Sequence, residues 1–97
     1  MELDYSPRQS GKTTRIVEWL RLNPMGLVVT FSRDRADAIK KEFGLSEGSV
    51  LSWDEYYKGY KTYGKDISEI VIDDVDIILQ KICKEKINKV TFSKIKN

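Results

Sequence analysis

Hydrophobic residues along the 97-residue chain alternate between helical spacing and short β-branched runs. Helical spacing follows residue 11 and returns after residue 32, and the apolar positions concerned are Ile16, Val17, Trp19 and Leu20, then Ala36, Ile39 and Phe43. Asn23-Pro24 should end the first of these helices, and Gly44 should end the second, for which Ser32 is the candidate cap. The pattern therefore predicts helices on either side of a strand at 27–31.

Further strands and helices continue this alternation toward the C-terminus. Strands are predicted at 2–5, 49–52, 68–72 and 89–93 in addition to 27–31. Ser52-Trp53-Asp54-Glu55 forms a capping box, so a third helix should begin at Trp53 and run toward Gly64, and a fourth is marked by Val75, Ile78, Leu79 and Ile82. We therefore expect one α/β domain over residues 1–97, with three layers and a mainly parallel sheet of about five strands.

A candidate phosphate-binding loop lies between the first predicted strand and the first helix. Its sequence is Ser6-Pro7-Arg8-Gln9-Ser10-Gly11-Lys12-Thr13-Thr14. In the pattern G-x-x-x-x-G-K-[ST], backbone N–H groups surround a phosphate at the positive end of a helix. Lys12 would contact the outer phosphates and Thr13 would ligate Mg²⁺, while the amides of Thr13 and Thr14 would open the helix. Ser6 replaces the first glycine of the pattern, and Gly-Lys-Thr by itself also arises by chance.

A second candidate motif ends the strand predicted at 68–72. The β-branched run Ile70-Val71-Ile72 stops at Asp73-Asp74, as expected of a buried parallel strand that delivers carboxylates to its carboxyl edge. Asp73 would hold Mg²⁺, and Asp74 would orient or deprotonate the water that attacks the γ-phosphate. The alternative is that the two acids simply cap the helix that begins near Val75.

Together these segments resemble the ATPase core of the large terminase subunits of tailed bacteriophages and of related helicase-like P-loop ATPases. The resemblance rests on Arg8-Gln9-Ser10-Gly11-Lys12-Thr13-Thr14, the strand at 27–32 and the run 70–74. It implies a Walker A loop in which Arg8, Gln9 and Ser10 contact nucleotide with Gly11, Lys12, Thr13 and Thr14. It also implies a Walker B strand with Lys12 and Asp74 as catalytic residues, Thr13 and Asp73 as metal ligands, and ATP and Mg²⁺ as cofactors. Family members usually place glutamate where this chain has Asp74, and the family's coupling motif and nuclease domain have no counterpart before Asn97.

Charge is nearly balanced over the whole chain but not along it. Lysine and arginine number 17 against 15 acids, a net charge of +2 that is too small for a dedicated nucleic-acid coat protein. The segment 81–97 concentrates six lysines against Glu85, and they are Lys81, Lys84, Lys86, Lys89, Lys94 and Lys96. This segment could bind DNA through its phosphates, although lysine-rich termini more often serve only solubility.

An aromatic stripe accompanies the third predicted helix and has two interpretations. Its members are Trp53, Tyr56, Tyr57, Tyr60 and Tyr63, interleaved with Lys58, Lys61 and Lys65. The rings could stack on the bases of a single nucleic-acid strand, or they could pack the helix onto the sheet, which we favour.

The arginine finger of the expected ATPase is not identified by the sequence. Arg15, Arg33 or Arg35 could act across an interface.

Cysteine and histidine content limits the metal chemistry and the compartment. Cys83 is the only cysteine and there is no histidine, so a disulfide within the chain or a zinc site is excluded, whereas oxygen ligation of Mg²⁺ is not. No apolar stretch has the length of a membrane span, and the N-terminus lacks the form of a signal peptide. We therefore expect a cytoplasmic location, in the host cytoplasm if the chain is of phage origin, and no membrane partner.

Two functions from different classes remain open at this stage. The first is a small ATP-binding protein of phage or mobile-element type, an expected Mg²⁺-dependent ATPase with slow or partner-dependent hydrolysis that acts as a homo-oligomer or with a protein partner. The second is a non-catalytic module that keeps the nucleotide-binding fold in order to bind DNA or a host protein. Ser6 and Asp74 favour the second, and the pairing of the two motifs favours the first.

Overall fold

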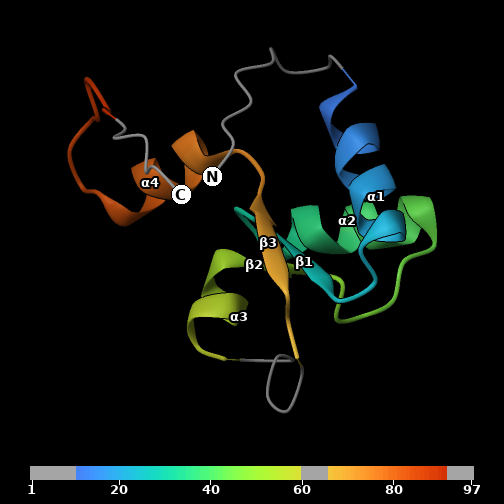
Figure 1. Cartoon of the computed structure of the whole chain (residues 1–97). Coiled ribbons are helices and arrows are strands. Elements are labelled where there is room, and N and C mark those ends of the chain that lie inside the picture. Colours follow the sequence, from blue (N-terminus) through green and yellow to red (C-terminus); the bar gives the residue numbers. More distant parts are fainter. Residues whose placement is uncertain (1–10, 60–65, 92–97) are drawn as a thin grey trace.

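Helices and strands alternate through the described part of the chain, residues 11–59 and 66–91 of a computed structural model (Figure 1). The elements are α1 (Lys12–Leu22), β1 (Gly26–Thr30), α2 (Arg33–Phe43), β2 (Val50–Ser52), α3 (Trp53–Tyr57), β3 (Glu69–Ile72) and α4 (Val75–Ile82). This order confirms a mixed α/β architecture. The predicted first strand, residues 2–5, lies outside the described residues.

The three described strands form one parallel sheet in the order β2-β1-β3. Both β2 and β3 run in the same direction as the central strand β1. Val28 of β1 is level with Val50 of β2 and with Val71 of β3. Parallel strands need crossover connections, which α2 supplies between β1 and β2. All three carboxyl ends therefore lie at one edge of the sheet.

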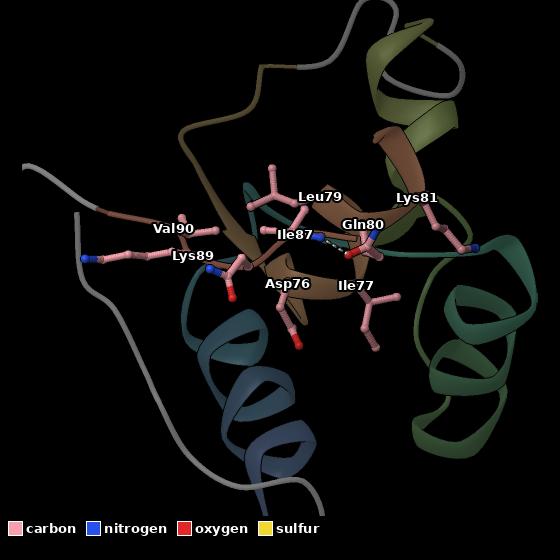
Figure 2. A pocket seen from close by; sticks show the side chains of 9 residues that line it. Asp76, Ile77, Leu79, Gln80, Lys81, Ile87, Lys89 and Val90 are labelled. Carbon is pink, nitrogen blue, oxygen red and sulfur yellow. Dashed lines mark hydrogen bonds between the residues drawn. The ribbon is translucent and has the colours of Figure 1, made fainter. Parts of the chain in front are cut away.

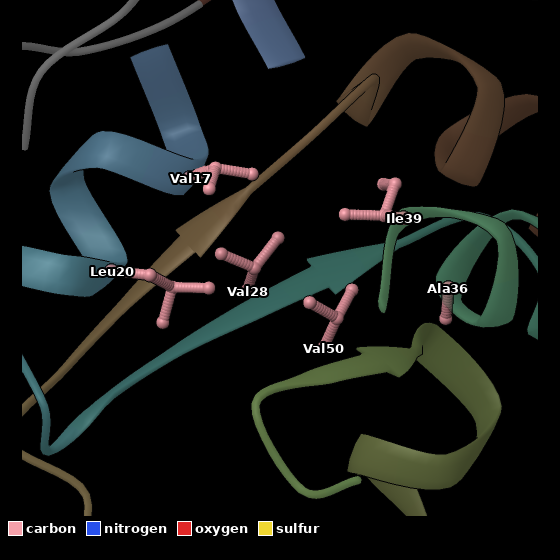
Figure 3. Close-up of a cluster of buried hydrophobic side chains, with 6 residues drawn as sticks. All are labelled: Val17, Leu20, Val28, Ala36, Ile39 and Val50. Carbon is pink, nitrogen blue, oxygen red and sulfur yellow. The ribbon is translucent and has the colours of Figure 1, made fainter. Parts of the chain in front are cut away.

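Helices α1 and α2 cover one face of this sheet. Val28 and Val50 project from the strands into a cluster with residues of both helices, and its buried members are Val17, Leu20, Val28, Ala36, Ile39 and Val50 (Figure 3). The helical spacing of Val17 and Leu20, and of Ala36 and Ile39, is what places them on the covered side. The predicted apolar stripes are confirmed as the main core of the protein.

The opposite face is covered by the short helix α3 and by Ile67. Leu27, Val29 and Leu51 are buried there, and Trp53 and Tyr56 pack against them. The packing interpretation of the aromatic stripe is thus confirmed for Trp53 and Tyr56. Tyr57 stacks on Trp53 with ring centroids 5.9 Å apart and is otherwise exposed, and Tyr60 and Tyr63 lie outside the described residues.

Capping residues set most helix ends as predicted. The Ser32 hydroxyl accepts a hydrogen bond from the backbone N–H of Arg35, and Gly44 ends α2 in the left-handed region. The capping box of Ser52 and Glu55 is present at the start of α3. The prediction that this helix continues toward Gly64 is wrong, because α3 ends at Tyr57 and Gly59 follows with φ of 79°, a conformation that leaves the helix.

Three predictions about the sheet need correction. The described residues contain three strands rather than about five. Of the final strand predicted at 89–93, residues 89–91 are not in a strand, and residues 92 and 93 lie outside the described residues. Strand β3 is not buried, since Glu69, Ile70 and Ile72 are exposed. The reason is that β3 pairs with β1 on one side only and occupies an edge of the described sheet. A continuous apolar run therefore indicated a strand correctly but not its depth in the sheet.

Gly26 makes a close approach that a side chain would block. A Cβ at this position would lie 2.5 Å from Cη2 of Trp19 and 3.0 Å from the carbonyl oxygen of Asn23. We expect Gly26→Ala to lower the free energy of unfolding by about 1–3 kcal/mol, because an indole packed between α1 and β1 cannot shift freely. Urea denaturation measures the change, with Met25→Ala at the exposed neighbouring position as a control that should stay within about 0.5 kcal/mol. Equal stabilities of the two variants would contradict the steric argument.

Candidate functional site

The two candidate motifs meet at the carboxyl edge of the sheet. Helix α1 begins with Lys12 at the end of the molecule toward which β3 points, and Asp73 and Asp74 follow β3 at that same end (Figure 1). The backbone N–H of Asp73 donates to the carbonyl oxygen of Val29 at 2.8 Å, which extends the pairing with β1 one residue past the strand. Strand pairing therefore fixes the position of the first carboxylate.

Lys12 contacts both carboxylates. Its Nζ atom donates a hydrogen bond to Oδ1 of Asp74 at 2.6 Å and lies 3.4 Å from Oδ1 of Asp73. Lys12 and Asp74 are 62 positions apart in the sequence, so only the fold brings them together. The predicted juxtaposition of Lys12 with Asp73 is confirmed.

Asp73 is the most deeply buried acid of the site. Its side chain is fully inaccessible, and neither carboxylate oxygen has a hydrogen-bond partner among the described residues, so the Lys12 contact is an ion pair without a directed hydrogen bond. Burial raises the pKa of Asp73, and the neighbouring charge of Asp74 raises it further, while Lys12 and Arg35 act in the opposite sense. This buried carboxylate has Lys12 as an ion-pair partner but lacks a hydrogen bond to either oxygen among the described residues.

The surroundings of Lys12 favour its charged form. Partial burial lowers the pKa of Lys12, but the hydrogen bond to Asp74 and the charges of Asp73 and Asp74 together outweigh that effect, and the net pKa is raised. Lys12 is therefore a permanent cation at the start of α1 at neutral pH. In this position it can exchange its carboxylate partners for an incoming anion.

Asp74 adopts an unusual backbone conformation at the start of α4. It is the one non-glycine residue in the described part of the chain with positive φ, at 54°, a region that aspartate tolerates better than most residues. Asp74 occupies the N-cap position of α4, yet its side chain makes no capping hydrogen bond and instead accepts from Lys12. The capping alternative for the acidic pair thus describes the position of Asp74 but not the use of its carboxylate.

Thr13 and Arg35 form a second contact at this edge. Nη2 of Arg35 donates to Oγ1 of Thr13 at 2.9 Å, linking the first turns of α1 and α2. Sequence reasoning offered Arg35 only as one of three arginines for action across an interface. A signal was present in its position just after Ser32, because residues that follow a parallel strand collect at the same edge.

A buried hydroxyl lies at the same level of the sheet. Thr30 ends β1 and is fully buried, and its Oγ1 atom has no hydrogen-bond partner in the described residues. Since Val29 pairs with Ile72, the next residues along each strand, Thr30 and Asp73, stand side by side. Sequence reasoning missed Thr30. Two neighbouring residues therefore hold buried oxygens without a hydrogen bond at the edge where Lys12 and Thr13 begin α1.

The structure describes only some of the remaining residues predicted to bind nucleotide. Arg8, Gln9 and Ser10 lie outside the described residues. Gly11 has φ of 81° at the N-cap of α1, which agrees with a tight turn into the helix, and Thr14 is exposed. In the described segments no group of three or more acidic, cysteine or histidine side chains forms a metal cluster. The side-chain oxygens that this edge offers to a cation belong to Thr13, Thr30, Asp73 and Asp74.

Comparison with known proteins adds no relative. No family model, curated protein or solved structure matches this chain. A function can therefore be inferred only from the geometry of the site itself.

A separate hollow of about 570 Å³ lies between α4 and the segment 87–90 (Figure 2). Gln80 holds this segment, since its Nε2 donates to the Glu85 carbonyl and its Oε1 accepts from the Ile87 N–H, each at 2.8 Å. None of the predicted nucleotide or metal residues lines this hollow. Its wall is formed by Asp76, Ile77, Leu79, Gln80, Lys81, Ile87, Asn88, Lys89 and Val90.

The lysine-rich segment is exposed where it is described. Lys84, Lys86 and Lys89 have exposed side chains, whereas Lys81 donates to the carbonyl oxygen of Phe31 at 3.0 Å and lies 5.3 Å from its ring centroid. Lys81 therefore helps to hold α4 near the end of β1. Contact of this segment with DNA stays a prediction, and Lys94 and Lys96 lie outside the described residues.

None of the helices placed by the structure is both long and apolar enough for a bilayer span.

Proposed function

We propose that this chain binds Mg²⁺ and ATP at the carboxyl edge of its sheet, in a minimal P-loop-like site. The observation behind the proposal is the contact of one lysine, at the first residue of a helix, with two carboxylates that follow a parallel strand. A helix start with a lysine attracts phosphate, and carboxylate and hydroxyl oxygens attract magnesium. Both kinds of group occur here within a few ångströms.

The unpaired carboxylate of Asp73 supports the metal part of the proposal. A buried charge without hydrogen bonds is costly, and a divalent cation would supply the missing partner. Thr13 follows Lys12 on α1, so a cation bound to Asp73 could also receive the Thr13 hydroxyl. Magnesium usually takes only one or two protein ligands and completes its shell with water and phosphate oxygens, which suits so small a donor set.

Lys12 supports the phosphate part. In the absence of nucleotide it is held by Asp74, and a triphosphate that carries Mg²⁺ would offer it a stronger anion while the metal takes over neutralisation of Asp73. The exchange releases the Asp74 carboxylate from Lys12 and so makes it available to a water molecule. The residues then have the roles expected of them: Lys12 on the outer phosphates, Thr13 and Asp73 on the metal, and Asp74 near the attacking water.

Hydrolysis is expected to be slow. Asp74 is a shorter carboxylate than the glutamate usual at this position in the ATPases that the chain resembles, so it reaches less far toward an attacking water. Phosphate release with ATP and Mg²⁺, measured with and without DNA, separates a weak ATPase from a binding module that does not turn over. The nucleotide site is the same in both cases.

Loss of nucleotide binding in Lys12→Ala is the direct test. Calorimetric titration of ATP and GTP, each with and without Mg²⁺, should give Mg²⁺-dependent binding for the natural chain. Affinity should fall by at least about tenfold for the variant, because a charge-assisted phosphate contact is removed. Circular dichroism establishes that the variant is folded under the conditions of the titration.

Lys41→Ala is the matched control for this experiment, since Lys41 is an exposed lysine in the last turn of α2. Its affinity should equal that of the natural chain. Unchanged affinity of Lys12→Ala, or equal losses in the two lysine variants, would defeat the assignment of the phosphate site.

A further inference from the structure

Arg35 lies at the candidate nucleotide site of its own chain. Its guanidinium donates to the Thr13 hydroxyl at 2.9 Å, and its positive charge acts on the buried Asp73, whose pKa it lowers against the effect of burial. The backbone of Arg35 is held by the cap of α2, where its N–H donates to the Ser32 hydroxyl at 3.1 Å. The side chain therefore extends from a fixed point toward the proposed metal and phosphate positions.

The hydrogen bond from Arg35 to Thr13 is formed in the ligand-free protein. Lys12 and Arg35 supply two positive charges to Asp73 and Asp74, and Arg35 uses a lone pair of the Thr13 oxygen. If Mg²⁺ binds to the Thr13 hydroxyl, its double positive charge lies next to the Arg35 guanidinium and repels it. Arg35 then needs a new anionic partner within reach of the first turn of α2.

Resting on the proposed function, we propose that Arg35 transfers from the Thr13 hydroxyl to the outermost phosphate of bound Mg²⁺-ATP and so distinguishes ATP from ADP. A planar guanidinium matches two phosphate oxygens at once, which lysine cannot do. Mg²⁺-ADP lacks the outermost phosphate, so with this ligand the guanidinium gains no such contact. Arg35 is thus a specificity-determining residue for the number of phosphates, acting in its own chain and not as a finger in a neighbouring one.

Nucleotide affinities of Arg35→Gln test this assignment. Titration with Mg²⁺-ADP and with a non-hydrolysable Mg²⁺-ATP analogue should give a loss of about tenfold or more for the triphosphate, the effect of one charged hydrogen-bond contact, and about twofold or less for the diphosphate. Arg35→Lys should recover only part of the loss. Arg33→Gln, at an exposed position in the same helical turn, should leave both affinities unchanged.

The outcomes separate this inference from the nucleotide site itself. Equal losses for triphosphate and diphosphate in Arg35→Gln, or no loss for either, would overturn the role of Arg35 while Lys12 still defines the site. Full recovery in Arg35→Lys would replace bidentate recognition by simple charge and would also overturn it. If the natural chain binds neither nucleotide, the proposed function fails, and the inference fails with it. Thermal unfolding of each variant shows whether an affinity loss reflects loss of fold.

Discussion

Asp73→Asn is expected to stabilise the ligand-free protein and to remove the magnesium dependence of nucleotide binding. The carboxylate it replaces is fully buried, has no hydrogen bond in the described residues, and lies near a second acid. Asparagine has nearly the same shape and no charge. Lys12 keeps its hydrogen bond to Asp74 in this variant. We expect the free energy of unfolding at neutral pH to rise by about 1 kcal/mol, toward the lower end of the range for an unsatisfied buried group.

The pH dependence of this gain follows from the raised pKa of Asp73. The folded protein holds the proton of Asp73 more tightly than the unfolded chain, so natural-chain stability falls as pH rises from the ordinary value of 3.8 through the raised value. The gain in Asp73→Asn should therefore vanish below 3.8 and reach its full size above the raised pKa. Urea denaturation across this range measures it, and a gain that persists in acid would contradict the charge argument.

Although Asp73→Asn should increase stability, it should weaken the binding of Mg²⁺-ATP. Mg²⁺-ATP should bind to Asp73→Asn no better than ATP without metal, because the proposed metal has lost its charged ligand. Asp66→Asn is the control, since Asp66 is exposed and should affect neither stability nor binding. A protein made more stable by removal of a residue and less able to bind its ligand is the pattern expected of a functional site. Loss of stability together with loss of binding would instead make Asp73 a structural residue.

Lys12→Ala is expected to lower the free energy of unfolding of the ligand-free protein by about 1–3 kcal/mol. The variant leaves two neighbouring carboxylates at the sheet edge without the cation that both contact. Breaking a buried ion pair from one side typically costs more than this, and the partial exposure of Lys12, at 19% of its side chain, reduces the effect. The variant should remain folded enough for the binding measurements.

Two measurements identify the origin of that loss. In acid the stability deficit of Lys12→Ala should narrow as Asp73, whose pKa is raised by burial, becomes protonated. In strong base it should narrow again as the natural Lys12 loses its proton, because the raised pKa of Lys12 means that its stabilising effect is lost as pH rises beyond 10.5. The double variant Lys12→Ala/Asp73→Asn should recover much of the stability. A double-mutant cycle with no coupling energy between the two sites would refute the ion-pair explanation.

Local sequence signals predicted the helices and strands of the described residues well. Ser32, Gly44 and the capping box of Ser52 and Glu55 act through hydrogen bonds and backbone preferences within a few residues, so their effects could be predicted without the fold. The apolar stripes of α1 and α2 likewise depend only on helical spacing. The end of α3 was mispredicted because Gly59 ends a helix whose aromatic spacing continues beyond it.

The depth of β3 and the contacts of the candidate site required the tertiary structure. An apolar run is compatible with a central or an edge strand, and only the order β2-β1-β3 made β3 an edge of the described sheet. The sequence indicated that Lys12 and Asp73 should share one edge. It did not indicate that Asp74 would take the shorter contact with Lys12, or that Arg35 would bind Thr13 across two helices.

By itself, the sequence determined which segments are helix or strand and which residue types stand where each begins or ends, because propensity, capping and periodicity act over a few neighbouring positions. The tertiary structure decided which of those ends meet. Parallel pairing of β1 with β3 and packing of α1 and α2 on one face bring together Lys12, Thr13, Arg35, Asp73 and Asp74. Side-chain contacts between residues 22 and 62 positions apart depend on strand order and helix packing, which no local pattern specifies.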